Sequence, residues 1–167
     1  MKRHTTPDPE ALFRDAEQYE EKGNLRSAFE CLLAAAQLGH AMSQVSVGNF
    51  YASGKGVRRS LQRAAYWYKR AYKNGYRDGA LNLAIDRRNE GNTRSAVLWL
   101  KKAIAMNSGD AYIELAKIYG SRKRRQKAGV DLLKRALRMS RDNISEDAKV
   151  EAKSLLKAMA TPAWPVT

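Results

Sequence analysis

The residues of this chain that could carry chemistry are few and scattered. Its two histidines, His4 and His40, lie near the N-terminus and at an expected turn between helices, and neither has metal-ligand spacing to another histidine or a cysteine. Cys31 is the one cysteine, so no intramolecular disulfide can form, and it takes a position that large apolar residues fill elsewhere. The sequence therefore predicts a non-enzymatic protein with an inert thiol, no metal and no cofactor.

Two short stretches match catalytic or phosphate-binding patterns only in part. Glu17, Glu20 and Glu21 lie close together, but a solvated helix surface or an acidic patch explains them better than paired catalytic acids do. The stretch SGKGVRR at 53–59 places glycines beside a lysine, yet it follows a predicted helix and lacks the Gly-Lys-Ser/Thr ending of a P-loop. We expect a structural turn there.

Positive charge is the clearest compositional signal. The 167 residues carry a formal net charge of +14, and two basic blocks supply the excess: residues 54–77 have eight Lys/Arg and no acid, and residues 117–138 have nine against one Asp. Such clusters attract polyanions, so an RNA- or DNA-binding helical repeat is the alternative function, and a merely solvated surface is equally open. The candidate polyanion contacts are Arg58, Arg59, Arg122, Lys123, Arg124 and Arg125.

An internal repeat predicts the elements that would position these residues. Residues 23–32 read GNLRSAFECL (the first copy) and residues 91–100 read GNTRSAVLWL (the second copy). Small residues recur at spacings of 32 to 36 in two columns: Ala16, Gly48, Ala84 and Ala116, and Ala35, Ala71, Ala103 and Ala136. Apolar residues also recur three and four apart, with a break in each period, which predicts two amphipathic helices per repeat.

The predicted fold is all-α, an α-solenoid of four helix pairs with a C-terminal capping helix. The predicted helices span 9–22, 26–38, 41–53, 60–74, 79–90, 94–107, 110–120, 124–139 and, for the cap, 145–160. Tails are expected at 1–8 and 161–167, on either side of a repeat domain at 9–160.

One part of the repeat resembles a known family. The stretch VGNFYASGKGV, followed by RAAYWYKRAYKNGY and GALNLA, resembles the Sel1-like repeat, a relative of the tetratricopeptide repeat, most specifically over residues 41–77. The matching positions are Val47, Gly48, Tyr51, Gly54, Gly56, Val57, Ala64, Trp67, Tyr68, Ala71 and Gly75. Ser60 departs from the usual Asp, which puts that loop's capping contact in doubt. The resemblance implies an α-solenoid that holds other proteins.

The expected binding surface is the concave face, which the first helix of each pair would line. An apolar ladder with spacings of 32 and 36 and flanking polar residues are expected there. The ladder is Phe13, Val45, Leu81 and Ile113, and the flanking residues are Glu17, Asn49, Ile85, Arg88 and Lys117. Either the ladder is open and forms a groove for a partner, or neighbouring helices or the C-terminal segment cover it.

A protein or peptide partner, acidic where it meets the basic blocks, is the expected ligand. A toxin inhibitor of the immunity or antitoxin type is one such role for a chain that consists of repeats. No window reaches the about 18 consecutive apolar residues that a membrane helix needs, and the single cysteine fits a reducing compartment, so a cytoplasmic location is expected. The oligomeric state does not follow from the sequence.

Overall fold

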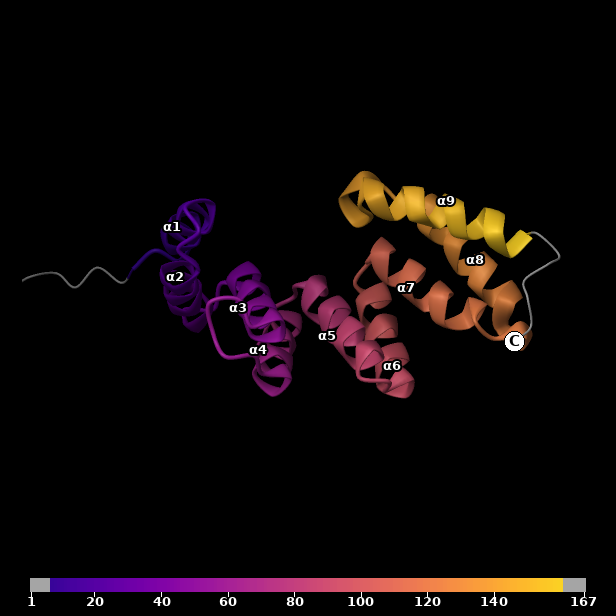
Figure 1. The fold of residues 1–167 in the computed structure, drawn as a ribbon. Coiled ribbons are helices and arrows are strands. Elements are labelled where there is room, and N and C mark those ends of the chain that lie inside the picture. Colours follow the sequence, from indigo (N-terminus) through magenta and orange to yellow (C-terminus); the bar gives the residue numbers. More distant parts are fainter. Residues whose placement is uncertain (1–6, 161–167) are drawn as a thin grey trace, which may run out of the picture. The chain divides into compact units, whose positions relative to one another are not determined.

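The computed structural model describes residues 7–160, except for the side chains of Lys123 and Ala160. Over that range the regular elements are all helical, as predicted (Figure 1). They are α1 (Pro9–Glu21), α2 (Leu25–Gln37), α3 (Ala41–Ser53), α4 (Leu61–Lys73), α5 (Arg77–Asn89), α6 (Thr93–Ala105), α7 (Gly109–Gly120), η1 (Lys123–Arg125), α8 (Gln126–Leu137), η2 (Arg141–Asn143) and α9 (Glu146–Ala160). No α-helix boundary differs from its predicted position by more than two residues. Most of the predicted tails, 1–6 and 161–167, lies outside the described residues.

The two copies form the same turn between a first and a second helix. Gly23 and Gly91 have φ values of 72° and 78°, a left-handed conformation that costs glycine little, and they end α1 and α5. Asn24 and Asn92 then cap α2 and α6, each accepting a hydrogen bond from the amide three residues later at 3.3 Å and 3.1 Å. The copies therefore recur because each begins a second helix.

The two columns of small residues lie in the core, as the repeat predicts. All eight are buried, and the alanines among them are at most 1% exposed. Gly48 shows why size matters, because a Cβ at this position would overlap the ring of Tyr68 on α4. Small residues thus allow the helices of a pair to pack closely.

The helices divide into two compact units at Asp86 and Arg87. Unit 1 contains α1 to α4 and most of α5, with α1 packed on α2, α2 on α3, and α3 on α4. Unit 2 contains the end of α5 and the helices from α6 onward, with α6 packed on α7, α7 on α8, and both α7 and α8 on α9. The cap predicted at the C-terminal end is therefore α9 (Figure 1).

The connection between α3 and α4, residues 54–60, is a structural turn as expected. Arg59 donates from Nε to the carbonyl oxygen of Ala52 at 2.9 Å, and Ser60 caps α4 by accepting from the amide of Arg63 at 3.3 Å. Gly56 lies against Leu25, since an added Cβ would come within 2.9 Å of its Cβ. Serine therefore supplies the cap that the missing aspartate had put in doubt, and the loop covers the start of α2.

Candidate functional site

Three of the four ladder residues are buried, which agrees with a covered ladder, one of the two alternatives that the sequence left open. Val45, Leu81 and Ile113 are 7%, 9% and 1% exposed, while Phe13 is half-buried with its ring edge on His40, at 5.2 Å between ring centroids. Each ladder residue precedes a member of the first small column by three positions, and residues three apart share one face of a helix. The ladder thus lies on the packed face of its helices.

In unit 1, Asn49 of α3 and Asn82 of α5 lie beside the ladder and are hydrogen-bonded to each other. We call this pair the amide surface. Asn49 of α3 and Glu17 of α1 are exposed, and Ile85 of α5 is half-buried. The Oδ1 of Asn49 accepts two hydrogen bonds, from the hydroxyl of Tyr68 at 2.8 Å and from Nδ2 of Asn82 at 3.0 Å. Asn82 was missed by the sequence reasoning, although it lies next to Leu81; in the repeat it corresponds to Ser46, whereas Asn49 corresponds to Ile85.

Two amide groups of this surface stay available to a ligand. Among the described residues, neither Nδ2 of Asn49 nor Oδ1 of Asn82 has a hydrogen-bond partner. Burial, and then the carboxylate of Asp86, raise the pKa of the Tyr68 phenol, so Tyr68 stays protonated and donates at neutral pH. The tyrosine therefore fixes the orientation of Asn49, and the amide surface presents one donor and one acceptor.

Of the residues first considered for catalysis or metal binding, His40 has polar partners within the fold, Cys31 is half-buried, and His4 lies outside the described residues. His40 precedes α3, with Nε2 at 3.2 Å from Glu10 Oε1 and Nδ1 at 2.7 Å from Ser43 Oγ. Cys31 is half-buried, and burial followed by the charges of Asp15 and Glu30 raises the pKa of its thiol, which disfavours the reactive thiolate. Within residues 7–160, no three His, Cys, Asp or Glu side chains come together as metal ligands.

In unit 2, the equivalent row of residues is charged and already paired. Glu114 of α7 makes ion pairs with Arg88 of α5 and, at 2.7 Å, with Lys117, whose Nζ also lies 2.6 Å from Glu151 of α9. These four side chains join three helices and belong to one unit. Arg88 and Lys117 were expected to orient a partner, but their charges are neutralised within the chain.

The pKa of Lys117 reports the strength of this network. Burial acts to lower it, but hydrogen bonds and charge interactions with Glu114 and Glu151 outweigh burial and raise the pKa above its ordinary value. The network therefore stabilises the folded unit while Lys117 is protonated. Lys117 thus links α7 to α9 and Arg88 links α5 to α7, while the role of both residues in partner binding stays a prediction.

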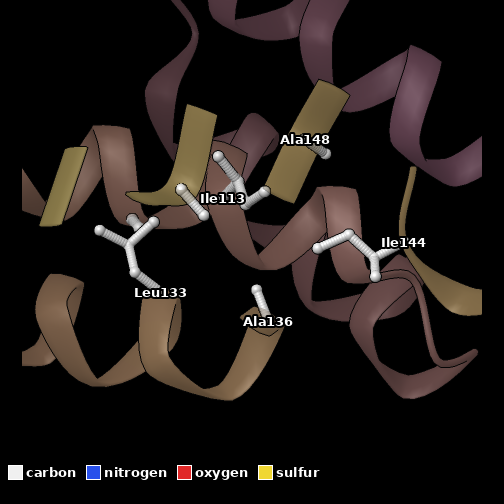
Figure 2. Packing of buried hydrophobic residues seen from close by; sticks show 7 residues of the cluster. Ile113, Leu133, Ala136, Ile144 and Ala148 are labelled. Carbon is white, nitrogen blue, oxygen red and sulfur yellow. The ribbon is translucent and has the colours of Figure 1, made fainter. Parts of the chain in front are cut away.

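The apolar face of α9 explains why Ile113 is buried. Figure 2 shows Ile113, Leu133 and Ala136 packed against Ile144 and Ala148 from the C-terminal segment. Ala152 is fully buried in the same cluster, and Leu155, Leu156 and Met159 pack around it. The C-terminal segment thus covers the last member of the ladder, which is the second of the two outcomes that the sequence left open.

The predicted polyanion contacts are divided between the units. Arg58 and Arg59 lie in the 54–60 loop of unit 1, where Arg59 is tied to Ala52, and Arg122, Arg124 and Arg125 are exposed in unit 2. The side chain of Lys123 lies outside the described set. Arg122 and Arg125 line a hollow of about 250 Å³ together with Thr93, Arg94, Val97 and Ile118.

A second hollow of about 530 Å³ adjoins the first. It shares Arg94 and Val97 with it and is otherwise lined by Asn92, Ser95, Leu98 and Lys101. We call the two together the basic hollow. Of its lining, only Arg122 and Arg125 were predicted from the sequence, because the other residues lie along α6 and at the end of α7.

Of the helices in the part of the chain that the structure describes, none is long and apolar enough to cross a lipid bilayer.

Comparison with protein families matches this chain to the Sel1 repeat. The family model described as the Sel1 repeat matches residues 9–40, 41–76 and 82–108, more than half of the chain. By sequence, no curated protein matches significantly.

Among solved structures, a Sel1 repeat protein from Oxalobacter formigenes aligns with a TM-score of 0.73 at 18% identity, over 95% of this chain and 66% of that one. A protective antigen of uropathogenic Escherichia coli, described as displaying an SLR fold, aligns with a TM-score of 0.74 at 21% identity, over 90% of this chain and 33% of that one. The chain therefore spans just under two thirds of the first structure and one third of the second, and both likenesses concern the fold.

Proposed function

Because this chain belongs to the Sel1 repeat family, whose members are generally protein-interaction modules, we propose that it holds a segment of a partner protein on the amide surface of unit 1. Family members are typically non-catalytic scaffolds, and a binding role without catalysis is proposed here as well. The partner lies across the first helices α1, α3 and α5, at Glu17, Asn49, Asn82 and Ile85.

The pair of open amide groups is the observation that supports this proposal. Every residue of a peptide except proline carries one backbone donor and one acceptor, and an extended segment presents them at its edge. Nδ2 of Asn49 can donate to a peptide carbonyl oxygen, and Oδ1 of Asn82 can accept from a peptide N–H. Since Tyr68 and the packed helices already hold both amides in place, little side-chain entropy is lost on binding.

The surroundings of the amides favour a partner segment of mixed character. Half-buried Ile85 offers a small apolar contact, and exposed Glu17 lies on α1, where Glu20 and Glu21 are exposed as well. A segment with a lysine or arginine at one end and an apolar residue at the other fits these groups. Such contacts steer and orient a partner more than they add affinity.

The test is quantitative mass spectrometry of proteins that co-purify with the tagged chain from nuclease-treated lysate, comparing the original protein with Asn82→Ala. Loss of one solvent-exposed hydrogen bond costs about 0.5–1.5 kcal/mol of stability, so the variant is expected to fold. Specific partners should fall about tenfold or more in recovery, because a partner's backbone group then loses its amide.

Asn89→Ala is the matched control, since Asn89 is an exposed asparagine at the end of α5 and outside the amide surface. It should retain the partners. The melting temperature of both variants is measured on the same samples. Full recovery of every specific partner by a folded Asn82→Ala variant contradicts the proposal.

The narrower hypotheses stay predictions. They are inhibition of a toxin, binding of RNA or DNA through the basic blocks, and a cytoplasmic location. The toxin hypothesis is checked by whether a partner found in this way is toxic when it is expressed without the chain.

A further inference from the structure

The basic hollow of unit 2 has an aliphatic floor and a cationic rim. Val97 and Ile118 form the floor between α6 and α7, and Leu98, 55% exposed, extends it. Arg94, Arg122 and Arg125 surround the smaller part, and Lys101 borders the larger one. Leu98 is therefore an apolar side chain, beside four cations, that the described residues leave exposed to solvent.

The hollow exists because unit 2 has small aliphatic residues where unit 1 has aromatic ones. In unit 1, 68 positions earlier, Phe29 packs against Phe50 at 5.8 Å and against Tyr51 at 5.3 Å between ring centroids. The residues at these positions in unit 2 are Val97, Ile118 and Tyr119. Valine and isoleucine fill less space than two phenylalanines, so the same arrangement of helices leaves a depression.

The connecting loops widen this difference. In unit 1 the 54–60 loop covers the start of α2, where Gly56 lies against Leu25. In unit 2 the connection between α7 and α8 is shorter, residues 121–125, and it contributes η1 with its exposed arginines. The loop that covers a second helix in unit 1 is thus replaced by cations at the edge of an open hollow.

Within residues 7–160, no carboxylate pairs with the cations of the hollow. Among the described residues, the side chains of Arg94, Lys101 and Arg122 form no ion pair or hydrogen bond, and Arg125 stacks on the ring of Tyr119 at 5.1 Å. Helix α6 carries three Lys/Arg and no acid, and its positive N-terminal end borders the hollow. By contrast, Arg26 at the equivalent position of unit 1 pairs with Glu30 at 3.4 Å.

From this geometry we infer that unit 2 binds an acidic segment of a partner protein that carries a bulky apolar side chain between its carboxylates. The apolar side chain packs on Val97, Leu98 and Ile118, which removes aliphatic surface from water. The carboxylates bind Arg94, Arg122 and Arg125, because guanidinium groups match carboxylates in geometry and charge. The inference concerns a different surface from Asn49 and Asn82 and does not depend on it.

A peptide fits this surface better than a nucleic acid does. Proteins that bind single-stranded nucleic acids without sequence preference contact the phosphates and also stack the bases on aromatic side chains. The apolar residues that line the hollow are aliphatic, and the ring of Tyr119 is already covered by Arg125. The arginines alone would attract either ligand, and the floor favours the peptide.

Fluorescence anisotropy with a labelled peptide tests the inference. The probe has two aspartates on each side of a pair of leucines, and a second probe has serines in place of the leucines. The leucine probe should bind about tenfold more tightly than the serine probe, and Arg94→Gln should weaken it about tenfold. Leu98→Ser, at an exposed position, should weaken the leucine probe alone.

Arg135→Gln is the matched control, because Arg135 is an exposed arginine of α8 outside the hollow, and the change in net charge is the same. It should leave peptide binding within about twofold of the original protein. The inference is overturned if Arg135→Gln weakens binding as much as Arg94→Gln, if the two probes bind equally, if neither binds, or if a single-stranded oligonucleotide of equal charge binds more tightly. Asn82→Ala should not affect either probe, so failure here and failure of the amide surface are separate results.

Discussion

The first and second copies build the same helix start in unit 1 and unit 2, but the surfaces beside them differ. In the first copy Arg26 is followed four residues later by Glu30, and the two form an ion pair. In the second copy Arg94 is followed four residues later by Leu98, so the arginine has no carboxylate one turn away and the leucine is exposed. The shared letters, Gly-Asn and Arg-Ser-Ala, thus set the turn and the packing, and the letters that differ set the surface.

The first-helix rows of the two units show the same division. Both rows bury their ladder residues, Val45 and Leu81 in unit 1 and Ile113 in unit 2. Unit 1 then exposes neutral amides, whereas unit 2 places charges there that pair with one another and with Glu151 of α9. The two units therefore share one packing scheme and differ in the side chains beside it.

Truncating Phe29, which is a valine in the second copy, should give the largest effect. Phe29→Ala removes a buried ring that packs on two aromatic neighbours and should cost about 3–5 kcal/mol of unfolding free energy. Val97→Ala at the half-buried equivalent should cost about 1 kcal/mol or less. Urea denaturation followed by circular dichroism measures both. Equal losses would mean that the second copy is packed as tightly as the first.

Removing the central carboxylate of unit 2 should come next. Glu114→Gln leaves Arg88 and Lys117 without their shared acceptor and should cost about 1–3 kcal/mol, whereas Asn49→Ala in unit 1 should cost about 0.5–1.5 kcal/mol. The raised pKa of Lys117 means that its contribution is complete below the ordinary lysine pKa and is lost as pH rises through the folded value.

The pH dependence of the stability loss distinguishes Glu114→Gln in unit 2 from Asn49→Ala in unit 1. The Lys117 part of the Glu114→Gln effect should therefore disappear at strongly alkaline pH, and the Arg88 part should persist. Thermal melts of both variants between neutral pH and pH values above the ordinary lysine pKa check this. A Glu114→Gln loss that does not change with pH would contradict the ion pair of Lys117.

The shared capping residues should show where the copies are alike. Asn24→Ala and Asn92→Ala each remove one helix cap with the same hydrogen-bond pattern, so each should cost about 0.5–2 kcal/mol, and the two values should agree closely. The measurement is the urea midpoint of each variant. A large difference between them would show that the turn depends on its unit as well as on its letters.

Filling the hollow should make unit 2 resemble unit 1. Val97→Phe places the larger side chain of the first copy over Ile118, in an open space of about 250 Å³, so stability should change by about 1 kcal/mol or less. Binding of the leucine-containing acidic peptide should weaken about tenfold, because the floor is occupied. If peptide binding stays unchanged in the folded variant, the floor does not contact the ligand.

Exchanging the residues four positions after the equivalent arginines, Glu30 after Arg26 and Leu98 after Arg94, should give the smallest effect. Leu98→Glu provides Arg94 with the ion pair seen in the first copy and should add about 0.3–0.5 kcal/mol, while Glu30→Leu should remove a similar amount. Melting temperatures at low and high salt check the sign and the screening. If neither change depends on salt, the pairing of these arginines has no role in the difference between the copies.

Much of the architecture could be predicted because local and periodic signals agree. Helix periodicity and the repeat columns placed every described α-helix boundary within two residues. For the ladder, the sequence left an open groove and a covered face as alternatives. Its three-residue offset from the small column is a signal for the covered face, because residues three apart share one face of a helix.

What the sequence alone determined is therefore what depends on neighbours along the chain: helices, caps, turns and the close-packed columns. Only the tertiary structure decided which charges are neutralised, as when Lys117 of α7 meets Glu151 of α9 and Arg88 of α5 meets Glu114 of α7. It likewise decided that Asn49, Tyr68 and Asn82 meet, and that Val97, Ile118 and Arg122 enclose a hollow. Side-chain pairing and cavity shape depend on distances between elements far apart in sequence, and no periodic pattern records those distances.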